Sequence, residues 1–276
     1  MPAPAAPGGL GPVTDTEDRV IGAGGPSVPA AGPATAAGAP WRAAADAPGC
    51  PVSYRFDAVV RAYVRRHPLA TVVALGEGLG TAFWRLDNGR LHWLSVEAPE
   101  TAAVRRMLLP DGPRRRTLAC PVTGPGWLDA VRAPERGVVV TARGLLMFLR
   151  PPEVRALFAA CAERFPGGAL VFDAVPRWCA GRTPPAAPPL RWGLNAADLP
   201  RIVGAHPNVV AVREVPPPGR GPLAGRLARW RQHVPLLHTP ARTVTEIRFG
   251  ARRTAAARLP GGAPADPERP AGHRSR

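Results

Sequence analysis

The stretch from residue 71 to residue 97 limits most strongly what this chain can fold into. Its first part, 71–75, is almost continuously apolar, as is typical of a strand buried inside a parallel sheet. A helix-like run follows, and a second apolar segment over 91–96 ends at Glu97. Between the first strand and the helix stand three alternating glycines, which let a backbone turn sharply and approach a ligand closely, namely Gly76, Gly78 and Gly80. The pattern therefore predicts a strand, a glycine turn, a helix and a second strand, arranged as a nucleotide cradle.

The spacing within this stretch indicates which ligand the cradle takes. Glu97 lies 21 residues after Gly76, the spacing at which an acid ending the second strand accepts hydrogen bonds from ribose hydroxyls. The helix is expected to present free N–H groups to the same ligand. Dinucleotide sites use G-x-G-x-x-G, whereas this chain has G-x-G-x-G, which resembles the first motif of S-adenosylmethionine (SAM) dependent methyltransferases. The alternative is that the glycines serve only to fit a tight turn.

Strands alternate with helices along the rest of the chain, which predicts a doubly wound, mostly parallel sheet. Further strands are expected over 116–122, 137–142, 169–173, 209–215 and 243–249. Helices are expected over 54–67, 81–86, 99–109, 127–131, 151–165, 195–206 and 223–234. The last strand alternates polar and apolar residues, so we expect it at the edge of the sheet.

Composition divides the chain into a folded domain and two flanking segments. Residues 1–50 are rich in Ala, Pro and Gly and contain one aromatic residue, Trp41, so they lack the apolar surface that offsets the entropy of ordering. We predict a disordered segment over 1–50, a methyltransferase domain over 51–252 and a disordered tail over 253–276. The chain contains no apolar run of 18 residues and no signal-peptide pattern, so we expect a cytoplasmic protein without membrane contact.

The positive charge of the chain is better explained by the codon usage of a GC-rich genome than by binding to nucleic acid. The formal net charge is +16, and every basic side chain except histidine is an arginine. With inflated Ala, Pro and Gly, this pattern is typical of GC-rich codon usage, and the arginines are scattered apart from Arg114–Arg116 and the C-terminal end. We therefore expect no nucleic-acid binding. The four cysteines have no C-x-x-C spacing, which excludes an obvious zinc site or disulfide framework and favours small buried thiols.

Several unusual stretches together carry a resemblance to a known family. They are Val72–Leu79, Phe83–Arg90, Val96–Thr101, Gly144–Leu149, Glu163–Pro176 and Arg191–Leu194. Between about Phe56 and Phe249 the chain resembles the leucine carboxyl methyltransferase-like family, and within it the bacterial polyketide O-methyltransferases typified by the tetracenomycin enzyme. The resemblance implies a class I SAM-dependent methyltransferase fold, Rossmann-like and seven-stranded, with one antiparallel strand at the edge and helices on both faces. It also implies SAM as methyl donor and a small-molecule acceptor.

The same resemblance implies the cofactor residues. Gly76, Glu77 and Gly78 would cradle the methionine part, with Gly80 beside them, and Glu97 would bind the ribose, with Ala98 next to it. Thr123 and Gly124 would lie near the adenine, and Arg143 follows the fourth strand.

Two of these positions depart from the family pattern. Gly124 stands where the family has an acid, and Arg143 stands where relatives carry Glu or Gln. Arg143 would place a positive charge near a sulfonium unless it turned away to pair with an acid such as Glu97 or Asp173. The segment before residue 51 also lacks the helices that cover the cofactor in relatives. A non-catalytic relative with weak or no SAM binding is therefore a second hypothesis, and an NAD-dependent oxidoreductase is a third.

The sequence does not assign a general base or the oligomeric state. His92, His233 and His238 are candidate bases, but none lies in a recognisable motif, which favours a surface or structural histidine at each position. Trp84 and Trp93 are expected in the core. Trp178 and Trp192 are candidates for an acceptor pocket beside the loops after the fifth strand.

Overall fold

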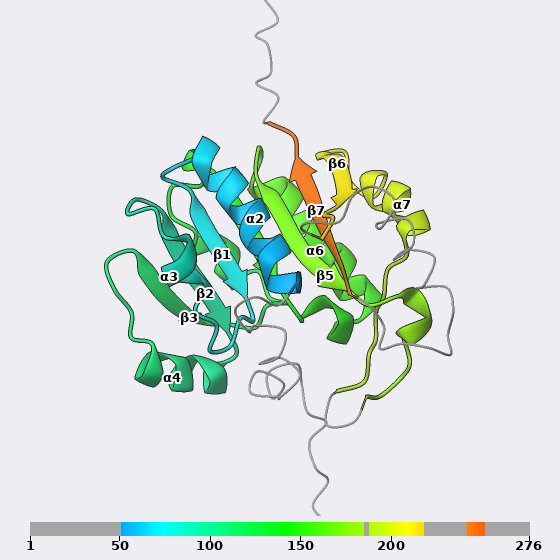
Figure 1. Ribbon diagram of the computed structural model, residues 1–276, viewed down its shortest axis with the longest axis horizontal. Helices are drawn as coiled ribbons and strands as arrows, with labels where there is room; N and C mark the ends of the chain where they lie inside the picture. Colours follow the sequence, from blue (N-terminus) through cyan, green and yellow to red (C-terminus); the bar gives the residue numbers. More distant parts are fainter. Residues whose placement is uncertain (1–50, 185–187, 218–241, 252–276) are drawn as a thin grey trace, which may run out of the picture. The chain divides into compact units, whose positions relative to one another are not determined.

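The computed structural model describes residues 51–184, 188–217 and 242–251, which form a seven-stranded sheet flanked by helices (Figure 1). The strand order across the sheet is β3-β2-β1-β4-β5-β7-β6. The strands are β1 Thr71–Leu75, β2 His92–Glu97, β3 Arg115–Ala119, β4 Val138–Ala142, β5 Ala169–Ala174, β6 Val209–Glu214 and β7 Thr243–Phe249. The predicted seven-stranded, mostly parallel sheet with helices on both faces is confirmed.

One strand is antiparallel, but it does not lie where the sequence predicts. β7 pairs antiparallel with β5 on one side and with β6 on the other, so β6 forms the edge and the prediction for β7 is wrong. The alternation in β7 misleads because two of its polar residues, Thr245 and Glu246, are buried. Glu246 is 2% exposed and pairs with Arg213 and Arg248. A polar residue in a strand indicates a solvent-facing position only when no partner inside the protein forms a hydrogen bond or ion pair with its side chain.

The helices are α2 Pro51–Arg66, α3 Ala82–Leu86, α4 Pro99–Leu108, α5 Gly126–Asp129, α6 Pro151–Arg164 and α7 Leu199–Val203. Short 3₁₀ turns occupy Pro134–Arg136, Leu146–Phe148, Arg177–Cys179 and Ala196–Asp198. The single helix predicted over 195–206 is therefore wrong, because a 3₁₀ turn and the short α7 share that range. The predicted helix over 223–234 and the flanking segments 1–50 and 253–276 lie outside the described residues.

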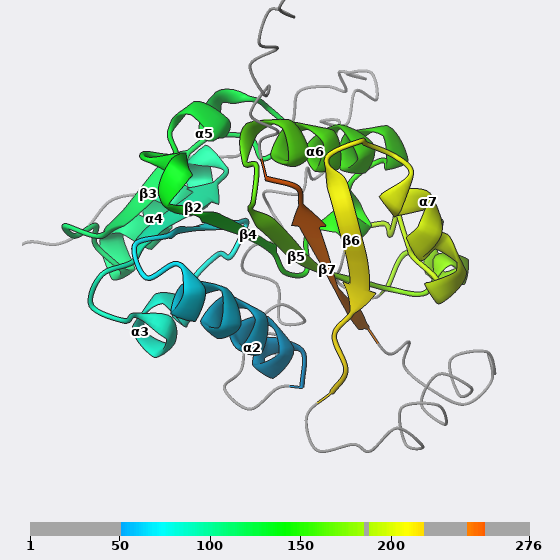
Figure 2. The ribbon, with the colours of Figure 1, turned by 90° about the horizontal axis from the view of Figure 1, so that it is seen from above.

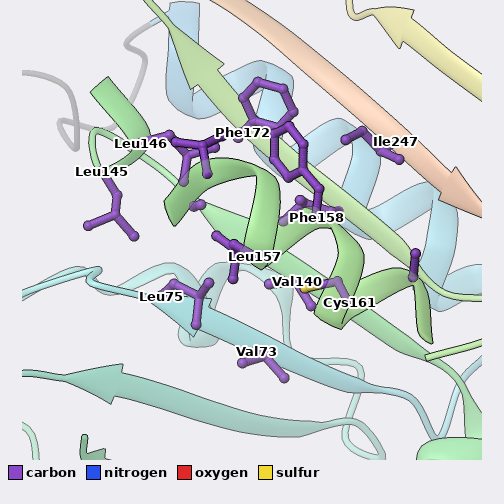
Figure 3. Close-up of a cluster of buried hydrophobic side chains, with 14 of the residues drawn as sticks. Val73, Leu75, Val140, Leu145, Leu146, Leu157, Phe158, Cys161, Phe172 and Ile247 are labelled. Carbon is purple, nitrogen blue, oxygen red and sulfur yellow. The ribbon is translucent and has the colours of Figure 1, made fainter. Parts of the chain in front are cut away.

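The two faces of the sheet are covered by different helices (Figure 2). Side chains of a strand alternate between faces, and in β1 Val72 and Ala74 pack with α2 and α3 while Val73 and Leu75 pack with α5 and α6. Figure 3 shows part of the cluster that contains Val73 and Leu75, in which α6 lies on β5. The ring centroids of Phe158 and Phe172 in this cluster are 5.2 Å apart. Both faces of the central strands are thus buried, as the continuous apolar runs predict.

The composition-based expectations can be compared with the same residues. Within the described residues, no helix is long and apolar enough to cross a membrane. Cys161 and Cys179 are buried free thiols, and burial raises the pKa of both. Cys120 is a free thiol that is half-buried. No group of three potential metal-ligating side chains occurs in the described part of the chain.

Candidate cofactor site

The glycine turn follows β1 and is hydrogen-bonded to the carboxyl end of the neighbouring strand β2. Gly76 and Gly78 have φ values of 58° and 62°, in the left-handed region that side chains disfavour, which explains why glycine stands at both positions. The N–H of Gly76 donates to the carbonyl of Val96 at 2.8 Å, and the N–H of Gly78 donates to Oε1 of Glu97 at 2.8 Å. The predicted turn and the predicted ribose-binding acid are therefore in direct contact.

A buried arginine, which sequence reasoning missed, donates hydrogen bonds to the backbone of the turn. The Arg105 side chain in α4 is 1% exposed and donates to the carbonyl oxygens of Gly78 and Gly80, the latter at 3.1 Å. Its Nη2 also donates to Oε1 of Glu77 at 2.6 Å. A usable signal was present, because Arg105 lies three residues after Ala102, on the face by which α4 packs on the sheet.

Glu77 accepts two further hydrogen bonds at the same oxygen. Trp93 Nε1 donates to Oε1 at 2.9 Å and Ser95 Oγ at 2.5 Å, both from β2. Glu77 is 6% exposed, so this network satisfies a carboxylate that would be costly to bury alone. The side chain of Glu77 thus stabilises the shape of the turn, and we keep its predicted place beside the methionine part as a proposal.

The helix predicted over 81–86 after the turn is α3, Ala82–Leu86. α3 has five residues and ends where Asp87 turns to extended geometry, and no side chain caps its N-terminus. The N–H of Gly80 bonds to the carbonyl of Glu77 at 3.1 Å, so the three glycine N–H groups all have acceptors inside the protein. The N–H groups at the start of α3 remain a predicted part of the cradle.

The remaining predicted cofactor residues lie in loops at the same edge of the sheet. Ala98 precedes α4 directly after β2, Thr123 and Gly124 follow β3, and Arg143 follows β4. Because these strands are parallel, their carboxyl ends meet at one edge, where the glycine turn also lies. Among the described residues, a Cβ built at Gly124 would contact the carbonyl oxygen of Pro121, at 3.4 Å, and no other atom. The fold thus brings the whole predicted set to one edge.

Arg143 extends toward α2. Its Nη1 donates to Ser53 Oγ at 2.9 Å, and its guanidinium carbon lies 5.8 Å from the ring centroid of Phe56. Asp173, suggested above as a partner, instead accepts the N–H of Gly144 at 2.5 Å and pairs with Arg242 at 3.2 Å. The guanidinium of Arg143 thus has a hydroxyl partner in the first turn of α2.

The space between Arg143, Glu77 and α2 is almost filled. The cavity there has a volume of about 20 Å³, and its apolar lining includes Phe56, Val60 and Leu75. This volume is close to that of one water molecule. It cannot hold a nucleoside, so α2 acts here as packing for the turn.

None of the histidines in the described residues lies at the carboxyl edge of the sheet, where the predicted cofactor residues lie; this edge is called the cofactor edge below. His67 precedes β1, His92 begins β2 and His206 precedes β6, and these three strands run parallel, so all three histidines lie at the opposite edge of the sheet. His92 is five residues before Glu97, about 16 Å along the strand. His92 is therefore unsuited to be the general base. His233 and His238 lie outside the described residues.

The burial of the four tryptophans agrees only in part with the prediction, which placed Trp84 and Trp93 in the core. Trp93 is buried, but Trp84 is 48% exposed, with the guanidinium of Arg115 4.3 Å from its ring centroid, so the core prediction for Trp84 is wrong. Trp178 is partly exposed and stacks with Arg182 at 4.7 Å. Trp192 packs against Phe158 and Phe172 of the core and lines a cavity between α6 and α7.

Comparison with known proteins gives one sequence relative. No protein-family model matches the chain. Over 113 residues, 33% are identical to tetracenomycin polyketide synthesis O-methyltransferase TcmP of Streptomyces glaucescens. The chain is similar to an O-methyltransferase. The match covers 41% of this chain and 42% of TcmP, so it spans less than half of the relative's length.

Solved structures with a related arrangement are methyltransferases by name. One is an O-methyltransferase family protein from Burkholderia thailandensis, with a TM-score of 0.46 and 17% identity, covering 73% of this chain and 57% of that one. Another is the N-methyltransferase NodS from Bradyrhizobium japonicum, solved with S-adenosylhomocysteine, with a TM-score of 0.48 and 13% identity, covering 80% and 100% of the two chains. With the glycine turn and Glu97, the similarity to TcmP supports SAM as the cofactor.

Proposed function

We propose that this chain is a SAM-dependent O-methyltransferase that acts on a small-molecule acceptor, an aromatic polyketide or a similar secondary metabolite. The observation that carries the proposal is the hydrogen bond from Gly78 N–H to Glu97 Oε1, which joins the glycine turn to the strand-end carboxylate. The similarity to TcmP supports the acceptor class and the oxygen atom as the methylated centre.

The residues at the carboxyl edge fit SAM in their chemistry. Gly76 and Gly78 keep side chains out of the turn, where the methionine part would approach the backbone. Glu97, 2% exposed at the end of β2, would accept hydrogen bonds from the ribose hydroxyls. Gly124, which would lie near the adenine, provides no side-chain acceptor for its amino group.

When bound, SAM would supply a methyl group from its sulfonium to an acceptor hydroxyl, whose proton would leave to solvent. The protein contributes mainly position, because Arg105 and Glu77 hold the turn in one shape before the cofactor arrives. Since the described histidines lie at the opposite edge, none of them would take the acceptor proton. An acceptor hydroxyl of phenolic acidity would need less help from a base.

Arg143 decides between this proposal and a non-catalytic relative. At roughly 4 Å from a sulfonium, a like charge would cost about 1 to 4 kcal/mol, between bulk-water and surface dielectric values. The hydrogen bond to Ser53 holds the guanidinium against the first turn of α2, which gives this arginine a defined position. The non-catalytic alternative is favoured by Gly124, which removes an acceptor, and is tested by the same experiment.

The test is calorimetric titration of the whole chain with S-adenosylhomocysteine and with NAD, beside the variants Arg143→Gln and Glu97→Ala. We expect micromolar binding of S-adenosylhomocysteine, at least tenfold weaker binding by Glu97→Ala, and no heat with NAD. No binding by the native chain with recovery in Arg143→Gln would support the non-catalytic alternative. Binding of NAD alone would refute both. Mass spectrometry of SAM reactions with a panel of aromatic hydroxy compounds and matched amines then separates oxygen from nitrogen methylation.

A further inference from the structure

A second cavity lies away from the predicted cofactor residues. It is a groove of about 580 Å³ between α6, α7 and the loop 190–194, and it contains none of the nine residues predicted to bind the cofactor. Small-molecule pockets typically measure about 300 to 1,000 Å³. The groove therefore has the size of a ligand site, on the face of the sheet that α6 covers.

The floor of the groove is apolar and partly aromatic. Its apolar lining comes from α6, from the loop after β5, from α7 and from the start of β6, and includes Val154, Phe158, Trp192, Leu194, Ile202 and Val209. The Trp192 ring meets Phe158 edge-on at 6.4 Å between centroids, so its orientation is set by the core beneath it. A rigid aromatic surface of this kind favours a flat, apolar ligand.

The polar lining of the groove is strongly cationic. Four arginines line it, Arg155, Arg177, Arg191 and Arg201, together with one acid, Asp198, and His206. Asp198 is shared between Arg177 at 3.0 Å and Arg201 at 3.3 Å. One carboxylate therefore serves two of the four guanidinium groups.

The other two arginines have no acid at hydrogen-bond distance. The side chains of Arg155 and Arg191 form no hydrogen bond and no ion pair with any described residue, and both are exposed. Arg191 acts on the nearby Glu153 only through its charge, which helps Arg150 to lower the pKa of that carboxyl. An arginine fork binds a carboxylate through two parallel hydrogen bonds, so these two side chains are suited to an anionic group.

We propose that the groove is a binding site for a small planar aromatic carboxylate, separate from the cofactor edge. The ring system would lie on Trp192 and Ile202, and the carboxylate would bind Arg155 and Arg191 at the rim. This site does not depend on methyl transfer, so a failure of the proposed function leaves it untouched.

The test compares an acid with its neutral isostere. The whole chain is titrated with 2-naphthoate and with 2-naphthamide by calorimetry. For ligands of about a dozen heavy atoms, a dissociation constant on the order of 100 μM is expected for the acid. The amide should bind about tenfold more weakly, because it lacks the charge-assisted hydrogen bonds. Binding of neither compound, or of both equally, would overturn the proposal.

Three variants locate the site. Arg155→Gln/Arg191→Gln should lose the preference for the acid, while the matched control Arg132→Gln/Arg136→Gln, at two other exposed arginines, should retain it. Ala159→Phe, which fills the groove from α6, should weaken both compounds at least tenfold. Unchanged binding in Ala159→Phe, or equal losses in the two arginine pairs, would contradict the assignment. Displacement of 2-naphthoate by S-adenosylhomocysteine would show that the two sites are not separate.

Discussion

Arginines contact the glycine turn and also line the α6–α7 groove, but they are buried and paired at the turn and exposed in the groove. At the turn, the Arg105 side chain is 1% exposed and bonded to Glu77 and to the carbonyl oxygens of Gly78 and Gly80. In the groove, Arg155 and Arg191 are exposed and have no side-chain partner among the described residues. The first arrangement is complete within the protein, whereas the second leaves its charges available to another molecule.

This difference has an energetic cause. Removing water from a charge costs several kcal/mol, so a buried arginine persists only where the fold supplies its acceptors. An exposed arginine keeps its water and costs the fold little. Substitutions should therefore damage stability at the turn and ligand binding in the groove, and the following predictions test that contrast in order of expected effect.

The largest effect is expected from Arg105→Met. The substitution keeps the apolar stem but leaves Glu77 buried without its cation, so we expect a loss of about 3 to 5 kcal/mol in the free energy of unfolding. Urea unfolding followed by far-UV circular dichroism measures it. Arg106→Met is the matched control, because the neighbouring side chain is exposed and bonds one carbonyl, that of Thr117, at 2.8 Å.

The double variant Glu77→Gln/Arg105→Met sharpens this prediction. If the two side chains act as a pair, the double variant should lose clearly less stability than the sum of the single losses, because neither charge is then left alone. Strict additivity would mean that Arg105 acts through its packing and through the glycine carbonyls, and that its ion pair with Glu77 contributes little.

A smaller loss is expected from Ser95→Ala. The hydroxyl is fully buried and donates to Glu77 Oε1 at 2.5 Å, so its removal takes one of three donors from the carboxylate. Hydrogen bonds to charged groups contribute about 1.5 to 3 kcal/mol, and the remaining donors Trp93 and Arg105 should keep the loss near the lower value. The same urea titration measures it, and a loss as large as that of Arg105→Met would contradict this ranking.

The ion pair of Arg114 and Asp87 lies between the two extremes of burial and should show a pH signature. The Arg114 guanidinium holds the pKa of Asp87 below its ordinary value. Because the folded-state pKa is the lower one, the pair stabilises the fold above the unfolded pKa of about 3.9 and loses this contribution as the pH falls through the folded value. For a partly exposed pair we expect less than about 1 kcal/mol.

Urea unfolding at pH 6 and at pH 3 measures this contribution in the native chain and in Asp87→Asn. The native chain should lose more stability on acidification than the variant does. An identical loss in both proteins would assign the acid sensitivity to other carboxyl groups.

How far the sequence predicts this molecule depends on the kind of signal. The strand 71–75 and the turn after it are confirmed to the residue, because buried parallel strands and positive-φ glycines leave direct marks on residue type. The position of β7 between β5 and β6 was not predictable from alternation, since the burial of Glu246 depends on Arg213 in the neighbouring β6 and on Arg248 two residues along β7.

The candidate site shows the same limit. The sequence placed Gly76, Gly78 and Glu97 together through spacing alone, but it gave Arg143 three possible surroundings and assigned Arg105 no role. Both arginines are placed by partners far along the chain, Arg143 by Ser53, 90 residues away, and Arg105 by Gly78, 27 residues away. Local patterns predict the backbone of a site, whereas the partners of its charged side chains follow only from the fold.

The smallest stability effect is expected in the groove itself. Arg155→Gln/Arg191→Gln should change the free energy of unfolding by less than about 0.5 kcal/mol, as is usual for exposed positions without partners. Removing two like charges from a rim that holds four arginines and one aspartate relieves repulsion, so any change should be a gain that fades as salt is raised. Urea titrations at 50 mM and 500 mM sodium chloride measure both parts. A loss above 1 kcal/mol would show that these two arginines belong to the fold, and the contrast with Arg105 would fail.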